Sequence, residues 1–324
     1  MLIGVIKERI NNENRVAATP ETVGRLIADG IDVYVEKNAG YKAGYNDEAY
    51  TNKGAIIKNS AAEICHNSHM LFKIWAPQKK EWSWLTHTPI ILADFSRCPK
   101  IPDMPIRAFD LNKIPRISRA QNMDILSSQD NLAGYKAAII AVNMINRSVP
   151  MMITSAGTLA PLKILIWGLG IAGLQAAATA KRLGAKVFAA DIRPESKKQA
   201  ASVGASFIPS GDIPKQINNF DIIITAAGSY KHSPLLINEH LFSLISSNVP
   251  VIDISGNVHR RISAANLLRG YNLPSLLANS SSQLFANNLY NFFRLIYDFQ
   301  SQNLNLNFND EIINQTYIGE RHNV

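Results

Sequence analysis

Short apolar runs alternate with amphipathic stretches through the first third of the chain. The apolar runs predict strands at residues 2–6, 31–36, 54–57, 70–75 and 89–94, and the amphipathic stretches predict helices at residues 21–28, 47–53 and 60–67. Thr19 is a predicted N-cap with Pro20 in the first turn, and Gly30 ends that helix. Strands that alternate with helices predict a parallel sheet with helical crossovers.

The same alternation starts again after residue 160. It predicts strands at residues 162–167, 186–190, 221–225 and 249–254, and a helix at residues 172–183. Residues 131–146 have apolar positions at helical spacing and predict a long helix that joins two domains. Near the C-terminus, the apolar residues from Leu284 to Phe299 predict one amphipathic helix that can return to the first domain.

The remaining stretches lack a regular pattern. Prolines at positions 99, 102, 105 and 115 predict an irregular passage, and the last twenty or so residues, rich in asparagine, predict a loosely held tail. We therefore predict an α/β fold with two Rossmann-like domains that have parallel sheets and are joined by long helices. The first domain is residues 1–128, completed by residues 276–324, and residues 129–275 form the second.

Composition supports a globular protein of this size. The 324 residues are about twice a typical domain, and 47% are apolar while 18% are charged, which excludes a disordered chain. Cys65 and Cys98 lack CxxC spacing, so neither a disulfide framework nor a structural zinc site is expected. His66 and His69 lie three apart in a predicted helix without a third ligand, so we expect no metal site.

Charge and hydropathy exclude further classes. The net charge of +8 comes from dispersed lysines and arginines, which argues against a nucleic acid partner and suits a phosphate-bearing cofactor or an anionic membrane face. The N-terminus has no signal-peptide pattern, and no apolar run of about 18 residues occurs, so we expect neither a signal peptide nor a membrane span.

A glycine motif follows the predicted strand at residues 162–167. Gly168, Gly170 and Gly173 have GxGxxG spacing and open the next predicted helix. The first glycine permits a tight turn, the second lets backbone approach a pyrophosphate, and the third lets the helix lie close to the strand. The N–H groups at the start of the helix, at Ile171 and Ala172, would face the phosphates. Alternatively, the glycines serve only tight helix–sheet packing.

An acidic residue lies where such a motif needs one. Asp191 ends the next predicted strand, 18 residues after Gly173, where its carboxylate can accept hydrogen bonds from the adenosine ribose. A carboxylate there repels a 2′-phosphate, which favours NAD(H). Arg193 can hold a 2′-phosphate, but it comes after Asp191, so NAD(H) remains preferred. Ile192 and Gly228 complete the predicted cofactor-binding residues.

Several segments carry a resemblance to a known family. Residues 7–21, 116–137, 151–158 and 272–293, together with the glycine motif, resemble the alanine dehydrogenase/pyridine nucleotide transhydrogenase family. Within that family the match is to the soluble NAD(H)-binding part of the proton-translocating NAD(P) transhydrogenase alpha subunit. The resemblance covers most of residues 1–293.

The resemblance implies a role for residues 116–127. In the family the matching segment lies over the nicotinamide ring, so Arg116, Gln121, Asp124 and Ser127 are the expected catalytic residues. Hydride transfer needs no protein nucleophile, only two nicotinamide rings held within reach and shielded from water. Taken without the resemblance, the segment predicts a solvated loop with a helix N-cap at Ser127 or Ser128.

The resemblance also implies partners and a location. Hydride would pass from NADH, held in the cleft between the two domains, to NADP⁺ on an NADP-binding beta subunit. Proton translocation would be performed by a membrane-spanning alpha part that is separate from this chain. The chain would then be a peripheral cytoplasmic subunit, docked on the inner membrane, and a homodimer.

Two alternative functions stay open. An alanine dehydrogenase would use Arg15 and Lys73 for substrate, but transhydrogenases keep both residues. Such dehydrogenases also place a catalytic histidine after the strand matching residues 91–94, where this chain has Asp94 and Phe95. The second alternative is an NAD-binding module without catalysis.

That second alternative rests on two departures from the family pattern. The stretch between Asp191 and residue 221 lacks the longer insertion that carries a tyrosine-bearing mobile loop, and residues 251–262 lack a glycine-containing acidic turn. Because closure of a loop excludes water, its loss predicts weaker NADH retention or slower transfer.

Overall fold

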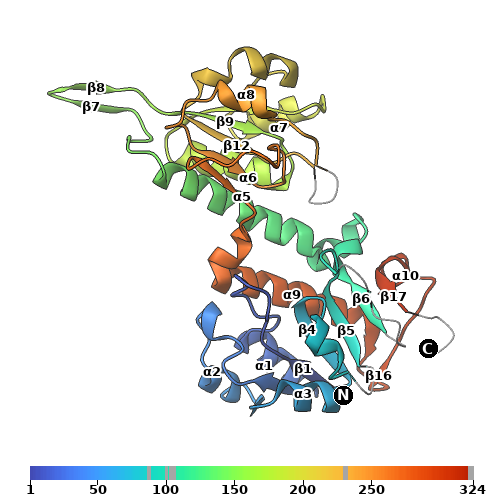
Figure 1. The fold of residues 1–324 in the computed structure, drawn as a ribbon. Coiled ribbons are helices and arrows are strands. Elements are labelled where there is room, and N and C mark those ends of the chain that lie inside the picture. The colour runs from blue at the N-terminus through green and yellow to red at the C-terminus, as the bar shows by residue number, and fades with distance from the viewer. Residues whose placement is uncertain (86–88, 99–100, 102–106, 229–232, 320–324) are drawn as a thin grey trace. The chain divides into compact units, whose positions relative to one another are not determined.

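The computed structural model describes residues 1–85, 89–98, 101, 107–228 and 233–319 (Figure 1). The chain divides into two compact units, which are called unit 1 and unit 2 below. Unit 1 comprises Met1–Gln129 with Ser275–Val324, and unit 2 comprises Asp130–Pro274. Of the prolines that predicted an irregular passage, those at positions 99, 102 and 105 lie outside the described residues.

Unit 1 is built on a seven-stranded sheet with the order β17-β6-β5-β4-β1-β2-β3. Its strands are β1 (Leu2–Val5), β2 (Asp32–Glu36), β3 (Ile56–Lys58), β4 (Met70–Trp75), β5 (Ile90–Asp94), β6 (Ala108–Asp110) and β17 (Tyr317–Ile318). All neighbours pair in parallel except β17 with β6. The chain therefore moves outward from β1 in one direction and from β4 in the other, which confirms the predicted parallel sheet.

Helices cover this sheet. They are α1 (Pro20–Ala28), α2 (Asp47–Thr51), α3 (Ala61–Asn67), α4 (Lys79–Trp82), α9 (Ala278–Ile296) and α10 (Glu311–Thr316). Thr19 caps α1 as predicted, because its side chain accepts a hydrogen bond from the Thr22 backbone N–H. The aromatic face of α9 is buried against the sheet, where Phe292 packs on Phe109 with ring centroids 5.1 Å apart.

The predicted C-terminal helix is correct in position but not in its bounds. It begins at Ala278 and ends at Ile296, so Phe299 lies beyond it. After the helix, β15 (Tyr297–Asp298) pairs antiparallel with β16 (Asn303–Leu304). The Phe299 ring folds back onto Phe293 and Tyr297 instead of extending the helix.

The prediction of a loosely held tail is wrong for the described residues up to 319. Asp310 caps α10 and forms an ion pair with Arg119, and Ile312 and Ile313 are buried. Tyr317 then packs on Phe109, with ring centroids 5.3 Å apart. The asparagine-rich composition indicated disorder, but a few apolar side chains find partners distant in sequence and fix the segment.

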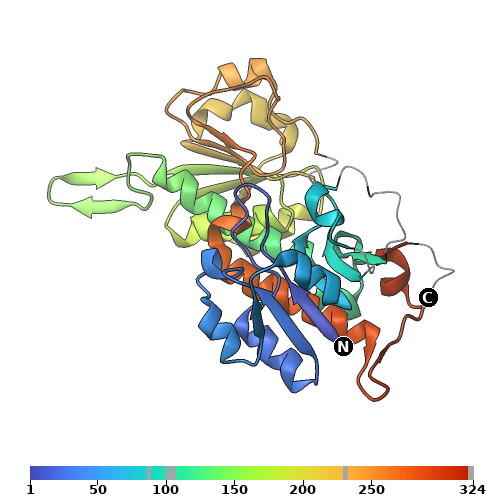
Figure 2. The same cartoon turned by 60° about the horizontal axis from the view of Figure 1, so that its bottom comes forward.

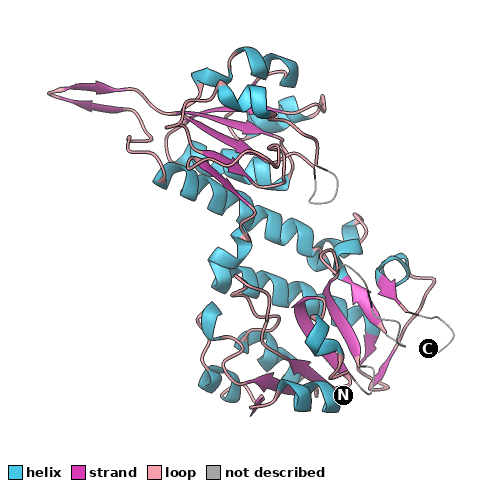
Figure 3. Ribbon diagram, viewed as in Figure 1, coloured by secondary structure: helices cyan, strands magenta, loops and turns pink. Residues whose placement is uncertain are grey.

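Unit 2 is built on a six-stranded parallel sheet with the order β11-β10-β9-β12-β13-β14. Its strands are β9 (Lys163–Trp167), β10 (Lys186–Ala190), β11 (Ser206–Phe207), β12 (Ile222–Thr225), β13 (Val251–Asp253) and β14 (Leu267–Arg269). Its helices α6 (Ile171–Arg182), α7 (Ser196–Ser202) and α8 (Glu239–Ser243) connect these strands (Figure 3). The chain order reverses between β9 and β12, as predicted for a doubly wound domain.

Alternate residues of β9 pack on opposite faces of this sheet. Ile164 and Ile166 belong to one apolar cluster, and Leu165 and Trp167 belong to another. Successive side chains of a strand point to opposite faces, so an almost entirely apolar strand predicts burial on both sides. This explains why the apolar run predicted a strand.

Helix α5 (Ile125–Asn143) crosses the boundary between the units, which falls after Gln129. It begins six residues earlier than the predicted helix at 131–146 and ends three residues earlier. A Cβ atom on Gly134 would lie 2.0 Å from the Ala172 carbonyl oxygen, so only glycine lets α5 approach the start of α6 this closely.

Residues 151–159 form a hairpin that the periodicity did not predict. Strands β7 (Met152–Thr154) and β8 (Gly157–Leu159) pair antiparallel, and every residue in both is exposed. Figures 1 and 2 show this hairpin projecting from unit 2. A hairpin with no core of its own leaves no buried face for a sequence pattern to reveal.

The order of the C-terminal segment can be tested by truncating its anchor. Ile312→Ala should lower the free energy of unfolding of the protein by about 2–4 kcal/mol, because it opens a cavity under α10. Gln315→Ala, on the exposed face of the same helix, should change it by less than about 0.5 kcal/mol. Urea denaturation measures both, and equal small effects would contradict a packed segment.

Candidate functional site

The turn after β9 is compressed against the turn after β12. Gly168 has φ +104°, and its N–H donates to the Ala190 carbonyl oxygen at 2.7 Å. A Cβ atom at this position would lie 2.5 Å from the backbone of Ala226 and Ala227. A side chain is therefore excluded both by the left-handed conformation and by the neighbouring backbone.

The other two glycines of the motif have different surroundings. A Cβ atom on Gly173 would lie 1.9 Å from the Gly168 carbonyl oxygen, so this glycine permits close packing of α6 on the turn. Gly170 is the N-cap of α6 and has no atom within 4 Å of an added Cβ. Within the described part of the chain, no side chain caps this helix. The start of α6 therefore offers backbone donors beside open space.

The first residues of α6 differ in exposure. Ile171 is 38% exposed, whereas Ala172 is buried. Ala172 is also the residue whose carbonyl oxygen α5 approaches at Gly134. The two predicted cofactor contacts at the start of α6 therefore differ. Ile171 has an accessible side chain, whereas Ala172 would contribute mainly its backbone.

Asp191 follows β10 directly and is surrounded by donors. Its Oδ2 accepts from the Leu169 N–H at 2.7 Å, and its Oδ1 accepts from the Arg193 N–H at 2.9 Å. The Arg193 guanidinium also donates to both carboxylate oxygens and to the Leu169 carbonyl oxygen, each at 3.0 Å. Arg193 therefore links the end of β10 to the glycine turn.

This arrangement holds Asp191 in its charged form. Burial alone would raise the pKa of Asp191, but the hydrogen bonds from Arg193 and from the Leu169 and Arg193 N–H groups outweigh it and lower the pKa to about 2. Ile192, between the two charged residues, is 87% exposed. Such an exposed apolar side chain beside the carboxylate suits a flat apolar ligand surface.

A second carboxylate organises the turns after β12 and β13, and sequence reasoning missed it. Asp253 accepts hydrogen bonds from the Thr225 hydroxyl and from three successive backbone N–H groups, at Gly256, Asn257 and Val258. Residues 251–262 therefore contain a turn organised by an acid, with Gly256 at φ +84°, so the prediction that they lack a glycine-containing acidic turn is wrong. An aspartate followed three residues later by Gly-Asn is the signal that could have revealed it.

Gly228 lies at the end of this constellation. It has φ +81° and is exposed, one residue after Ala227. Ala227 in turn is hydrogen bonded to the Asn257 side chain. Because β9 and β12 are neighbours at the reversal of strand order, Gly168 and Gly228 flank the same edge of the sheet, which is where doubly wound domains bind ligands.

The predicted catalytic segment lies in unit 1. Residues Ser118–Met123 form a 3₁₀ helix, and Arg116 and Gln121 are exposed. Asp124 Oδ1 accepts from the Ser127 N–H at 2.9 Å, and the Ser127 hydroxyl donates to Asp124 Oδ2. The cap of α5 is thus Asp124, not Ser127 or Ser128 as the segment taken by itself predicts. Among described residues, no ion pair joins Arg116 to Asp124.

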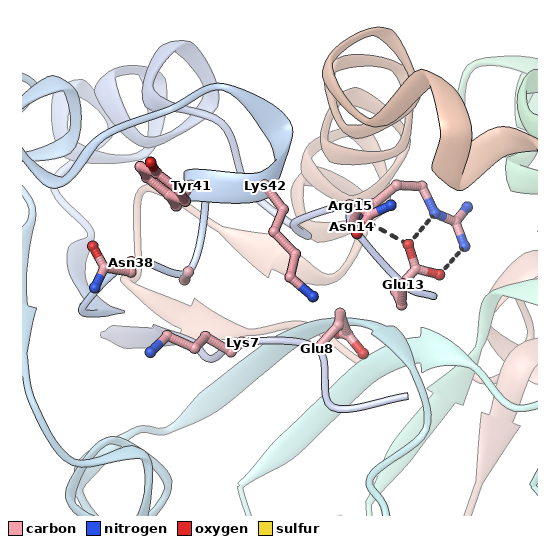
Figure 4. A pocket seen from close by; sticks show the side chains of 9 residues that line it. Lys7, Glu8, Glu13, Asn14, Arg15, Asn38, Tyr41 and Lys42 are labelled. Carbon is pink, nitrogen blue, oxygen red and sulfur yellow. Dashed lines mark hydrogen bonds and ion pairs between the residues drawn. The ribbon is translucent and has the colours of Figure 1, made fainter. Parts of the chain in front are cut away.

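A cavity of about 350 Å³ lies beside Arg15 in unit 1 (Figure 4). The Arg15 guanidinium donates to both carboxylate oxygens of Glu13, at 2.7 and 2.8 Å, and to Gln129 Oε1 at 2.7 Å. Burial would raise the pKa of Glu13, but its hydrogen bonds with Arg15 and Trp75 and the charge of Arg15 lower it to about 2. Arg15 is therefore neutralised within the chain.

Lys73 is neutralised in a similar way. Its Nζ lies 3.3 Å from Glu8 and 3.2 Å from Glu81, and all three side chains are almost fully buried. Burial raises the pKa of Glu8, although Lys73 opposes the shift. Asp94 and Phe95 stand where an alanine dehydrogenase is expected to have its catalytic histidine. Both side chains are buried, and burial raises the pKa of Asp94.

The family follows from matches that span nearly the whole chain. The model of the alanine dehydrogenase/PNT N-terminal domain matches residues 4–133, and that of the C-terminal domain matches residues 137–324. The chain belongs to the alanine dehydrogenase/PNT family. The predicted family and the predicted two-domain α/β fold class are thereby confirmed.

Named members of the alanine dehydrogenase/PNT family differ in their similarity to the chain. An NAD(P) transhydrogenase alpha subunit protein from Rhodospirillum rubrum is 34% identical over 375 residues, covering 98% of this chain and 96% of the relative. A transhydrogenase crystal structure from Sinorhizobium meliloti is 32% identical with a TM-score of 0.90, covering 99% of both chains. An alanine dehydrogenase from Methanococcus maripaludis is 26% identical over 272 residues, covering 79% of this chain and 72% of the relative.

Within the family, these similarities place the chain with the NAD-binding transhydrogenase alpha subunits, which are oxidoreductases, and the alanine dehydrogenases are more distant. The alignment with the R. rubrum protein spans 375 positions, more than the 324 residues present here, so that relative has segments without a counterpart in this chain. In the described ranges, no helix is long and apolar enough to cross a membrane, and no three histidine, cysteine or acidic side chains gather as a metal site.

The ionisation of Asp191 provides a test of its hydrogen bonds with Arg193. Arg193→Ala should raise the pKa of Asp191 from about 2 toward its ordinary value of about 3.9, because the main donor is removed. Carboxyl-carbon NMR titration measures the shift, with Arg182→Ala as the control.

The same shift predicts a pH dependence of stability. The folded pKa lies below the unfolded one, so the carboxylate contributes stability above about pH 4, and this contribution is lost as the pH falls through about 2. Arg193→Ala should lose that contribution at higher pH than the parent protein. An unchanged Asp191 titration would contradict the role assigned to Arg193.

Proposed function

We propose that the chain is the NAD(H)-binding subunit of a proton-translocating NAD(P) transhydrogenase. It would pass hydride between NADH held by unit 2 and NADP⁺ held by a partner subunit. The observation that carries the proposal is the open start of α6 beside the Asp191 carboxylate, at the reversal of strand order. The similarity to transhydrogenase alpha subunits over 98% of the chain supports it.

The described residues fit NAD(H). Backbone donors at Ile171 and Ala172, next to Gly170, would hold the pyrophosphate, and Gly173 keeps the helix in place. A carboxylate has about four lone-pair sites, and here the Leu169 N–H, the Arg193 N–H and two nitrogens of the Arg193 guanidinium occupy them. Asp191 would accept hydrogen bonds from the adenosine ribose in place of those from the guanidinium, whose side chain is 44% exposed and free to turn away. The ionised carboxylate disfavours a 2′-phosphate, so NAD(H) is preferred to NADP(H).

The nicotinamide itself supplies the hydride chemistry, and the protein contributes positioning. Arg116 and Gln121 are exposed and offer donors, and the Asp124–Ser127 pair fixes the end of the segment at the start of α5. By resemblance, we propose these four residues as the polar contacts of the ring and its ribose. A fixed segment of this kind can exclude water and hold a ring within reach of a second ring.

Partners follow from the same proposal. The chain would work with a membrane-spanning alpha part and an NADP-binding beta subunit on the cytoplasmic face of the inner membrane. A homodimer is supported by the β7–β8 hairpin, whose exposed apolar side chains include Met151, Ile153 and Leu159. Apolar surface of this kind on a projecting hairpin is typical of an interaction site. No nucleic acid partner is proposed.

The segments that this chain lacks relative to its relatives affect the expected rate of hydride transfer. The relatives have segments that this chain lacks, and we propose that the mobile loop between Asp191 and β12 is among them. An NAD-binding relative without turnover therefore remains the second candidate. Alanine dehydrogenase activity is disfavoured because Arg15 and Lys73 are both neutralised by glutamates of the chain and Asp94 and Phe95 stand where a histidine is expected.

The proposed function can be tested in two stages. The purified chain should bind NADH saturably and NADPH at least about tenfold more weakly, as measured by calorimetry. Addition of an NADP-binding transhydrogenase subunit should then allow hydride exchange between the two nucleotides. Binding without exchange would favour the non-catalytic candidate, ammonia- and pyruvate-dependent NADH oxidation would favour the dehydrogenase, and absence of NADH binding would overturn all three.

The role of the 116–127 segment predicts a separation of binding from turnover. Gln121→Ala should reduce hydride exchange by about tenfold or more while changing NADH affinity by less than about threefold, because the amide positions the ring and does not hold the pyrophosphate. Asn112→Ala, in a neighbouring turn, is the control. Equal losses of affinity and exchange would mean that the segment is only structural.

A further inference from the structure

Asn257 is a fully buried asparagine beside the proposed cofactor edge of unit 2, and it lies outside the glycine motif and the 116–127 segment. Its side-chain Nδ2 donates to the carbonyl oxygens of Ala227 and Pro234, at 2.8 and 2.9 Å. Its Oδ1 accepts from the Ala227 N–H at 3.1 Å. One amide therefore satisfies both backbone groups of Ala227.

The backbone of Asn257 fixes the same region from the other side. Its carbonyl oxygen accepts from the N–H groups of Leu236 and Ile237, at 2.9 and 3.1 Å. Ala227 and Pro234 are thus attached to the Asn257 side chain, and the residues after Pro234 are attached to its main chain. The segments that leave β12 and that return toward α8 are both anchored on this residue.

Asn257 is itself held in place by Asp253. The Asp253 carboxylate is 4% exposed and accepts from the Asn257 N–H at 2.8 Å, from its two chain neighbours and from the Thr225 hydroxyl at 3.0 Å. Thr225 is the last residue of β12 and Asp253 the last of β13. The rigid sheet therefore sets the position of Asn257, and Asn257 sets the position of Ala227.

The turn that is fixed in this way borders the glycine motif. Ala227 N would lie 2.5 Å from a Cβ on Gly168, so the two turns are in contact. In doubly wound domains the adenosine half lies toward the second strand of the motif, here β10 with Asp191, and the other half extends across the reversal of strand order. The fourth strand of this order, β12, with its turn at Ala227 and Gly228, is on that side.

We propose that Asn257 is a positioning residue for the nicotinamide half of NAD(H). It acts through Ala227 and Gly228, whose backbone it holds in register with the glycine turn, and it does not contact the adenosine half. The inference rests on the proposed NAD(H) site and adds a specific residue to it. An asparagine fits because it must donate twice and accept once, which a carboxylate or a hydroxyl cannot do.

A matched control separates positioning from ordinary stabilisation. Asn266 also joins two carbonyl oxygens through Nδ2, those of Val249 and Ser246, at 2.7 and 3.4 Å. It precedes β14, at the opposite end of the strands from Asn257. Asn266→Ala therefore removes a similar set of hydrogen bonds from the same unit without touching the cofactor edge.

The experiment compares NADH with ADP, which carries only the adenosine half and the pyrophosphate. Asn257→Ala should weaken NADH binding by about tenfold or more, because leaving the Ala227 groups unsatisfied costs enough to move the turn. ADP binding should change by less than about twofold. Asn266→Ala should leave both affinities within about twofold, with a smaller fall in thermal midpoint, because Asn266 is only half-buried and its side chain donates two hydrogen bonds.

Equal weakening of NADH and ADP by Asn257→Ala, or no weakening of either, would overturn the positioning role. If Asn257→Ala does not fold, Thr225→Val serves instead, since it keeps the side-chain shape and removes only the hydroxyl that orients Asp253. It should weaken NADH selectively by a smaller factor, and loss of the selectivity would overturn the role. Failure of the parent chain to bind NADH would instead contradict the proposed function.

Discussion

Contact between two backbone turns at Gly168 is the constraint on which the proposed cofactor edge of unit 2 depends. β9 and β12 are parallel neighbours, so their turns leave the sheet side by side, and no side chain fits between them. The ladder hydrogen bonds prevent either strand from moving away. The glycine turn and the turn at Ala227 are therefore in direct contact, and Asn257 holds the Ala227 turn from its other side. Precise placement of a ligand here comes from backbone packing more than from flexible side chains.

Carboxylates in both units accept hydrogen bonds from residues close to them in sequence, and each also accepts one from a more distant residue, namely Leu169, Thr225 or Trp75. Asp191 is bonded by the residue two positions later, Asp253 by those three to five positions later, and Glu13 by Arg15. For Asp191 and Glu13 these hydrogen bonds and the neighbouring arginine outweigh burial and keep the pKa of the carboxyl group low, at about 2.

Features with local causes were predictable from the sequence, and those with distant causes were not. β4 has the bounds 70–75 that its apolar run indicated, and the glycine motif lies at a strand–helix junction as its spacing required. The order of the C-terminal segment depends on Phe109, about 200 residues away in the chain, and the composition of the segment gave the wrong answer. The sequence did not reveal Asn257, because the three hydrogen bonds of its side chain form only when the sheet has folded. The roles of the 116–127 segment stay a prediction, because they rest on resemblance.

The antiparallel pairing of β17 with β6 has a consequence for behaviour in concentrated solution. β6 would otherwise be the outer strand of its sheet, with a row of free N–H and C=O groups able to recruit a strand from another molecule. The last described residues cover that row with a short segment of the same chain. β17 thus protects the sheet edge from pairing with another molecule, and a protein cut before α10 would aggregate through this edge while unit 2 remained folded.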